Sequence, residues 1–303
     1  MKKSRRGTAA ALLFAGSVVA ALTAGGCGET DLAGSSAAVD DDQETLQKFV
    51  EEEGLSGLSG PYDGERVPVE SDGAAREEID PLTFWRVVDQ KIWEHTVVID
   101  PEAGTAESES RVEVIGTLHI LDEGMVEYVK PMHHTGVRYA EFLRDPLGTG
   151  QNGNGQGGGD DSATQARRGP WVLTAVSGLR AQSDALTMAI DWVRYQGAAV
   201  DVTVTDPLDM FAVPDGIMAF SLGEQVTVTV SGPPQDALVF LHAAWVRLPL
   251  QCQPDYTFAG TWTVNRRGRH NAWVQALAHA SIFDSEYPDD SLVWGTPYRV
   301  LFE

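Results

Sequence analysis

Hydrophobic and polar residues alternate with a period of two along several segments, and this pattern predicts a mainly β protein. Residues 111–121 show it most clearly. Their apolar members are Val112, Val114, Leu118 and Ile120. Successive side chains of a strand point to opposite faces, so the spacing predicts one apolar face, with His119 on the other. The segments 137–144 and 171–179 are also predicted to be strands. Residues 83–100 favour a strand over a helix, although 84–93 fit either.

The C-terminal third contains at least six strand-like runs separated by Gly, Pro, Asn and Asp turns. This spacing predicts an antiparallel sandwich over residues 196–303. Three features resemble bacterial immunoglobulin-like domains: Gly-Glu-Gln before the VTVTV run, the FAGTWTV strand that begins at Phe258, and the Gly-x-His sequence that ends at His270. The resemblance implies an immunoglobulin-like fold in which His270 takes the aromatic position of a strand corner.

The segment 256–280 is predicted to be a β-hairpin. Its apolar positions are Phe258, Trp262 and Val264 before the turn, and Ala272, Val274, Ala276 and Ala278 after it. Residues 265–268 form the expected turn, with Gly268 able to take a positive φ. His270 is in phase with the small apolar residues, so we expect it to be half-buried and to hydrogen-bond locally. His279 is expected on the opposite face.

Residues 81–195 are predicted to form a β-rich domain, with an α+β unit as the alternative. The succession of its strands resembles the last strands of the cone-shaped fold typified by nuclear transport factor 2, which implies a pocket for a small apolar ligand. A glycine-rich loop is expected at residues 146–169. Its Gly153, Gly155 and Gly158 fit a dinucleotide-binding motif, but no apolar helix follows them, so we interpret them as loop residues.

The N-terminus combines four basic residues with an apolar run over residues 9–22, which predicts a signal peptide over residues 1–26. Residues 23–27, Thr-Ala-Gly-Gly-Cys, resemble the lipobox of bacterial lipoproteins. The resemblance implies that Cys27 becomes the lipid-bearing first residue of a protein anchored to a membrane outside the cytoplasm. The alternative is cleavage after Ala20 or Ala24 and secretion.

Residues 27–80 are predicted to form an acidic, disordered tether. Between residues 28 and 80 the chain has 16 Asp or Glu and 3 Lys or Arg, a composition that buries too little apolar surface to offset the entropy of ordering. Residues 44–53 could form two helical turns, with Leu46, Phe49 and Val50 on one side, but such a helix is marginal alone. The run Asp40 to Asp42 lacks the ligand spacing of a calcium loop.

The net charge of −22 argues against a nucleic-acid partner, because phosphate backbones are bound by clusters of Lys and Arg. The chain has two cysteines, Cys27 and Cys252. A lipid on Cys27 would leave Cys252 without an intramolecular partner, whereas an unmodified Cys27 could form a disulfide with it in an oxidising compartment.

No recognisable catalytic or metal-binding pattern occurs, and no cofactor is predicted. His133 and His134 are adjacent and would point to opposite sides of a strand. A site that combines His95, His119 and an acidic residue stays open as an alternative, and Cys252 has no histidine near it in sequence. We therefore expect a non-enzymatic lipoprotein of the bacterial cell envelope, with a role in adhesion, assembly or scaffolding and an envelope protein as partner. The alternatives are binding of a small apolar ligand and a secreted hydrolase.

Overall fold

The computed structural model describes residues 42–50, 60–69, 78–79, 81–145, 167–168, 170–244 and 246–301. The predicted signal peptide, Cys27, and residues 146–166 and 169 of the glycine-rich loop lie outside these ranges. Within them, no helix has both the length and the apolar character needed to span a membrane.

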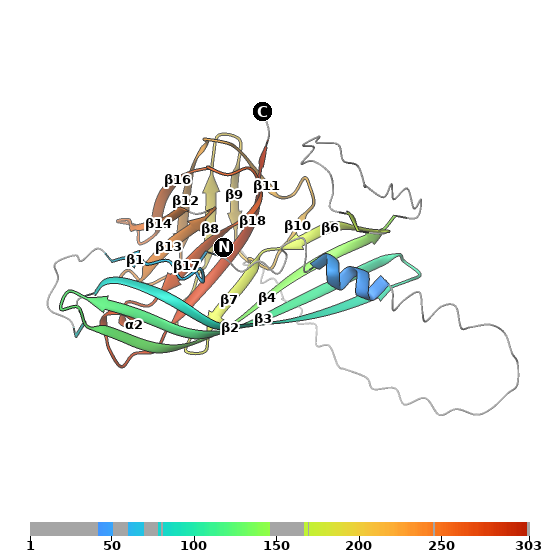
Figure 1. The fold of residues 1–303 in the computed structure, drawn as a ribbon. Coiled ribbons are helices and arrows are strands. Elements are labelled where there is room, and N and C mark those ends of the chain that lie inside the picture. The colour runs from blue at the N-terminus through green and yellow to red at the C-terminus, as the bar shows by residue number, and fades with distance from the viewer. Residues whose placement is uncertain are drawn as a thin grey trace, which may run out of the picture.

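The described chain is almost entirely β-structure (Figure 1). In chain order, a helical segment at 42–50 is followed by β1 (Val67–Pro68), β2 (Pro81–Asp100), β3 (Thr105–Asp122), β4 (Glu127–Arg144), β5 (Arg167–Arg168), β6 (Trp171–Ser177), β7 (Leu179–Ser183), β8 (Trp192–Gln196), β9 (Asp201–Val204), β10 (Met210–Ala212), β11 (Met218–Ser221), β12 (Gln225–Ser231), β13 (Leu238–Ala243), β14 (Val246–Pro249), β15 (Gln251–Cys252), β16 (Phe258–Thr263), β17 (Gly268–Leu277), α2 (Ala280–Phe283) and β18 (Ser291–Leu301). The mainly β fold predicted from the alternation is therefore confirmed.

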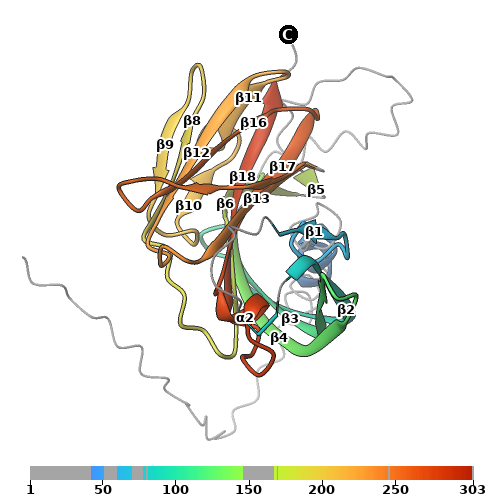
Figure 2. The ribbon, with the colours of Figure 1, turned by 90° about the vertical axis from the view of Figure 1, so that its left-hand side faces the viewer.

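The strands form two sheets. The main sheet has 13 strands and runs in the order β1-β2-β3-β4-β7-β18-β17-β13-β14, with β5, β6, β10 and β11 off this path. The second sheet has five strands in the order β15-β16-β12-β8-β9. In Figure 2 the strands of the C-terminal part rise above the long strands β2, β3 and β4, which curve beneath them.

Strands β2, β3 and β4 are the longest elements, at 18 to 20 residues each. Buried and exposed residues alternate along β3 and β4, as predicted, and His119 lies on the face opposite Leu118 and Ile120. A bulge between Val88 and Gln90 bends β2. A Cβ on Gly116 of β3 would lie 2.0 Å from the carbonyl oxygen of Val87, so only glycine lets β3 pass this bulge.

The C-terminal part is the predicted β-sandwich. The second sheet packs against β11, β13, β17 and β18 of the main sheet around one apolar core, which includes Val228, Trp262, Val274 and Tyr298. Strands β12, β16 and β15 are neighbours in one sheet, while β13, β17 and β18 are neighbours in the other. This is the partition of strands found in immunoglobulin-type sandwiches.

The predicted hairpin over residues 256–280 is wrong. Strand β16 pairs with β12 and β15 in the second sheet, whereas β17 pairs with β13 and β18 in the main sheet. The two strands face each other across the sandwich core, so the predicted apolar positions are buried, but the connection crosses between sheets. Alternation identifies the apolar face of each strand and cannot tell a hairpin partner from a strand in the facing sheet.

Parts of the predicted tether are packed against the folded body. Leu46, Phe49 and Val50 of the helix at 42–50 are buried in an apolar cluster with Phe142 and Trp171, and Figure 1 shows this helix, in blue, lying across the ends of the long strands. Tertiary packing thus stabilises a helix that would be marginal alone. Asp42 also contacts the folded body. Its Oδ1 accepts a hydrogen bond of 3.2 Å from the Trp171 indole, and its Oδ2 lies 3.3 Å from Arg144 Nη2.

Residues 60–69, here called the strap, form a second ordered part of the predicted tether. Tyr62 and Val67 are buried, and β1 pairs with β2. The Arg66 guanidinium lies 4.5 Å from the centre of the Trp85 ring. The strap therefore packs across both the long strands and the sandwich, because Arg247 of β14 donates hydrogen bonds to the carbonyl oxygens of Gly60 and Glu65.

The expected domain boundary between residues 195 and 196 does not match the strand pairing. Strand β8 belongs with β9 and β12 in the second sheet, and β7 pairs with β4 on one side and β18 on the other. The main sheet is therefore continuous from the long strands into the sandwich. Pairing between segments far apart in the chain leaves no signal in local composition.

Candidate functional site

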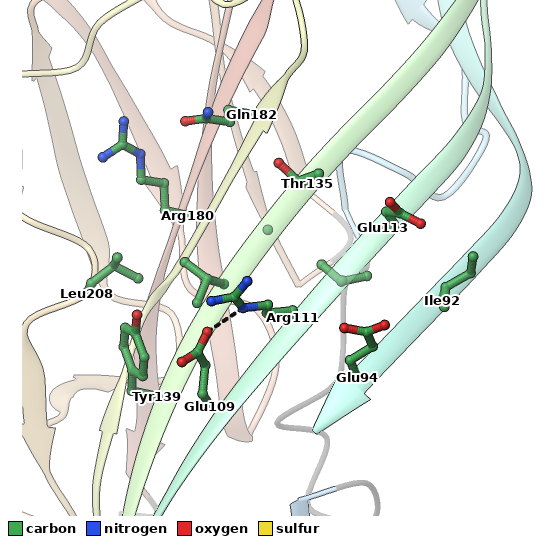
Figure 3. Close-up of a pocket in the computed structure, with 13 residues that line it drawn as sticks. Ile92, Glu94, Glu109, Arg111, Glu113, Thr135, Tyr139, Arg180, Gln182 and Leu208 are labelled. Atoms are coloured by element: carbon green, nitrogen blue, oxygen red, sulfur yellow. Dashed lines mark hydrogen bonds and ion pairs between the residues drawn. The ribbon is translucent and has the colours of Figure 1, made fainter. Parts of the chain in front are cut away.

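A wide groove lies on the face of the long strands that points away from the buried core (Figure 3). Its volume is about 650 Å³. The lining residues include Ile92 and Glu94 of β2, Glu109, Arg111 and Glu113 of β3, Thr135, Val137 and Tyr139 of β4, Arg180 and Gln182 of β7, and Leu208. The groove is thus built by one face of four adjacent strands.

Strand register arranges the groove residues in rows. One row runs Glu94–Arg111–Val137–Arg180 across the four strands, and the next runs Ile92–Glu113–Thr135–Gln182. Directly opposed side chains in neighbouring strands lie within contact range. The first row therefore presents charged and apolar groups side by side, and the second presents charged, polar and apolar groups, at the spacing of neighbouring strands.

The charges in the groove are well solvated. Arg111 forms an ion pair with Glu109, and their side chains are 70% and 32% exposed. The hydrogen bond that Arg111 donates to Glu109 raises the pKa of Arg111 above its ordinary value. Exposed pairs of this kind contribute little to stability, about 0–1 kcal/mol, so these side chains can exchange partners at low cost.

His133 lies on the same side of β4, beside the groove. Its Nδ1 is 2.7 Å from Asp184 Oδ2, and its Nε2 is 3.6 Å from Glu113 Oε1. The hydrogen bond to Asp184 raises the pKa of His133, against a smaller opposing effect of burial. This end of the groove therefore carries a positive charge more readily than an isolated histidine would.

On the opposite side of the same strand, His134 is part of a buried polar cluster. The cluster comprises Tyr62 of the strap, Arg86 of β2, His134 of β4, Gln275 of β17, Asp289, and Ser291 of β18, and all of its side chains are nearly inaccessible to solvent. His134 Nε2 donates to Asp289 Oδ2 at 2.9 Å, and the Tyr62 hydroxyl lies 2.6 Å from Nδ1. Arg86 Nη2 donates to both Asp289 and Ser291.

Burial and charge fix the protonation states in this cluster. Burial alone would raise the pKa of Asp289, but the charge of Arg86 and the hydrogen bonds from His134 and Arg86 outweigh it, so the pKa lies well below its usual range. Burial lowers the pKa of His134 in spite of Asp289, and burial raises the pKa of Tyr62. The cluster therefore holds one ion pair, a neutral imidazole and a neutral phenol.

The other singled-out residues lie apart from these two sites and from one another. His95 is 2.9 Å from the Ser110 hydroxyl, and His119 is 2.7 Å from Glu127. His270 is half-buried and donates from Nε2 to the carbonyl oxygen of Arg267 at 2.8 Å, which confirms the predicted local hydrogen bond. Cys252 is exposed in β15. The alternative site that would combine His95, His119 and an acidic residue is not assembled, because His95 is paired with Ser110 and His119 with Glu127.

The buried cluster was not predicted from the sequence. Its members come from five segments that are up to 229 positions apart in the chain, from Tyr62 to Ser291. One local signal was present: Arg86 occupies the same strand phase as the buried Phe84, and His134 the same phase as the buried Met132. Charged residues in an apolar phase point to a buried polar network.

Within the described residues, no group of three or more His, Cys, Asp or Glu side chains is arranged to hold a metal ion. No family model, curated protein or solved structure matches this chain.

Proposed function

We propose that this protein is a lipid-anchored binding protein of the bacterial cell envelope, which holds a partner protein against the groove on its long strands. The observation that carries the proposal is the groove itself: it is open and solvated, and it repeats charged, polar and apolar groups at the spacing of β-strands. Such a surface suits an extended polar segment of a protein partner.

Residues 1–27 supply the proposed anchor. The apolar run at 9–22 and the cysteine at position 27 resemble a lipoprotein signal, and several acyl chains on Cys27 would exceed the two-signal threshold for stable membrane attachment. The described body begins at residue 42, so only a short acidic segment would separate the anchor from the first packed helix.

Two other functions have less support. The groove lining includes three glutamates and two arginines, which disfavours a small apolar ligand because such ligands bind in mostly apolar pockets. A hydrolase would need accessible catalytic groups, and the Tyr62–His134–Asp289 arrangement is sealed from solvent.

The anchor is tested by the intact mass of the protein purified from a bacterium with lipoprotein processing, compared with Cys27→Ala. We expect the mass of acyl chains on the wild type and its loss in the variant. An unmodified wild-type mass would contradict the anchor and support secretion.

The binding face is tested by photo-crosslinking in intact cells from a benzoylphenylalanine placed at Thr135 in the groove. The matched control is the same probe at Thr203, an exposed threonine of β9 in the second sheet. We expect a discrete crosslinked protein from Thr135 and none from Thr203. Equal labelling from both positions, or none from either, would contradict a partner at the groove.

A further inference from the structure

A second cavity lies between the strap and the ends of β13, β14 and β17. Its volume is about 290 Å³. The residues that line it and carry the argument are Asp63, Glu65, His242, Arg247, Arg269 and Trp273. It lies apart from the groove described above, with which it shares no lining residue.

His242 lines this cavity and is 2% exposed. Its register partners on the neighbouring strands are Arg247 and Trp273, so these three side chains lie on the same face of the main sheet. Gly60 of the strap covers them, since a Cβ there would lie 3.0 Å from the Trp273 ring and 3.2 Å from His242 Cβ.

The buried cluster determines which nitrogen of His242 carries the proton. One orientation of the Gln275 amide gives hydrogen bonds to both of its neighbours. In it, the amide oxygen accepts from Arg86 Nη2 at 3.0 Å and the amide nitrogen donates to His242 Nε2 at 3.0 Å. Burial lowers the pKa of His242 to about 4, so the ring is neutral at pH 7. Its proton therefore lies on Nδ1.

The Nδ1 of His242 is a buried donor with no hydrogen-bond partner in the described part of the chain. Buried donors are almost always satisfied, because leaving one unsatisfied is destabilising. An unsatisfied donor on a residue that lines a cavity points to an acceptor atom supplied by a ligand.

The charges around the cavity favour an anionic acceptor. The lining includes three arginines, at positions 247, 266 and 269, and two carboxylates, Asp63 and Glu65, although the whole chain has a net charge of −22. Both carboxylates form ion pairs with Arg247, whose Nε is buried and makes no hydrogen bond within the described residues. Among the described lining residues, positively charged side chains thus outnumber negatively charged ones, which favours an anionic ligand.

We propose that this cavity binds a small monocarboxylate, whose oxygens accept hydrogen bonds from His242 Nδ1 and the Arg247 guanidinium. The volume corresponds to about ten water-sized groups at about 30 Å³ each, so the ligand is a compact molecule. Its apolar part packs against Trp273 and Val246, which also line the cavity. This inference is independent of the proposed anchor and partner.

Calorimetric titration of the full chain in detergent, at constant ionic strength, tests the proposal. The probes are butyrate, its neutral analogue butyramide, and inorganic phosphate. We expect one butyrate site and no heat from butyramide. Equal binding of butyramide would show an apolar site without carboxylate recognition, and preferential binding of phosphate would show a general anion site; either result would overturn the proposal.

Three variants locate the site. His242→Phe keeps the ring shape but removes the donor, and should weaken butyrate binding about tenfold or more; His119→Phe, on the long strands outside the cavity, should leave it unchanged. Arg269→Gln changes an exposed side chain of the same lining and should also weaken binding, even where His242→Phe does not fold.

Asp63→Asn provides a test with the opposite sign. Asp63 competes with a bound carboxylate for Arg247, so its neutralisation should tighten butyrate binding, whereas damage to the site would weaken it. Unchanged affinity in both His242→Phe and Asp63→Asn would contradict binding at this cavity.

Discussion

Two adjacent histidines on β4 show how much the environment of a side chain decides its role. His133 is 36% exposed beside the groove and pairs with Asp184, whereas His134 is fully buried and pairs with Asp289. Each region also contains an arginine–carboxylate pair, Arg111–Glu109 in the groove and Arg86–Asp289 in the buried cluster. The residue types match, and only burial distinguishes them.

Because of this difference in burial, the cluster contributes to stability, whereas the groove is available for binding. Charges in the groove remain solvated, so their pairs contribute little to folding and are available to a partner. Charges in the cluster have lost their hydration and depend on each other, because an uncompensated buried charge is strongly destabilising. The cluster therefore fastens the strap, the long strands and β18 together, while the groove can vary without loss of the fold.

The largest expected effect comes from Asp289→Asn. This change keeps the side-chain shape but leaves the Arg86 charge buried without its counter-charge, and should lower the free energy of unfolding by about 3–5 kcal/mol. Urea denaturation followed by circular dichroism measures it. The control is Asp184→Asn beside the groove, with an expected loss below about 1 kcal/mol. Similar losses in both variants would remove the distinction between the two regions.

The second prediction concerns the helix at 42–50, which packs on the same buried face of the long strands. Phe49 is 1% exposed, and its ring lies 5.3 Å from that of Phe142. Phe49→Ala should lower the free energy of unfolding by about 3 kcal/mol or more, because it leaves a cavity against Phe142. Lys48→Ala, at an exposed position of the same helix, is the control. If the two variants have the same free energy of unfolding, the helix does not stabilise the fold and belongs to the predicted tether instead.

The sequence predicted the strands and the sandwich because their faces are set locally. Buried residues at every second position of β3 and β12 are visible in the sequence alone. The local hydrogen bond of His270 at the start of β17 was likewise predictable, because its acceptor, the carbonyl group of Arg267, is only three residues away.

Features that depend on distant segments were not predictable in this way. The connection from β16 to β17 was misjudged because facing strands and hairpin partners share the same alternation. The helix at 42–50 was underrated because its stability comes from Phe142 and Trp171, about 100 residues or more away in the chain. Arg86 and His242 contact segments that are far apart in the chain, including the strap, β17 and β18. No local spacing therefore marks either site.

The third prediction uses pH to separate the two histidines. The pKa of His133 is raised, so its contribution to stability is present below about pH 6.5 and is lost as the pH rises through its folded pKa. The pKa of His134 is lowered, so its contribution is lost as the pH falls below about 6.5. NMR titration of the imidazole signals should show the two shifts with opposite signs.

A matching stability measurement uses His133→Gln. The variant should lose up to about 1 kcal/mol at pH 6 and less at pH 8, because the pair with Asp184 is exposed and matters only while the imidazole is charged. A loss that grows with pH would contradict the assigned ion pair.

The smallest expected effect on stability is that of Arg111→Gln. The variant removes the ion pair with Glu109, in which the Arg111 side chain is 70% exposed, and should leave the free energy of unfolding nearly unchanged. If the groove holds a partner, the same variant should nevertheless weaken crosslinking from the probe at Thr135, because Arg111 lies in the row next to it. A large loss of stability would show that Arg111 is needed for the fold. The groove could then not be assigned to binding alone. An unchanged fold with unchanged crosslinking would instead move the partner away from this face.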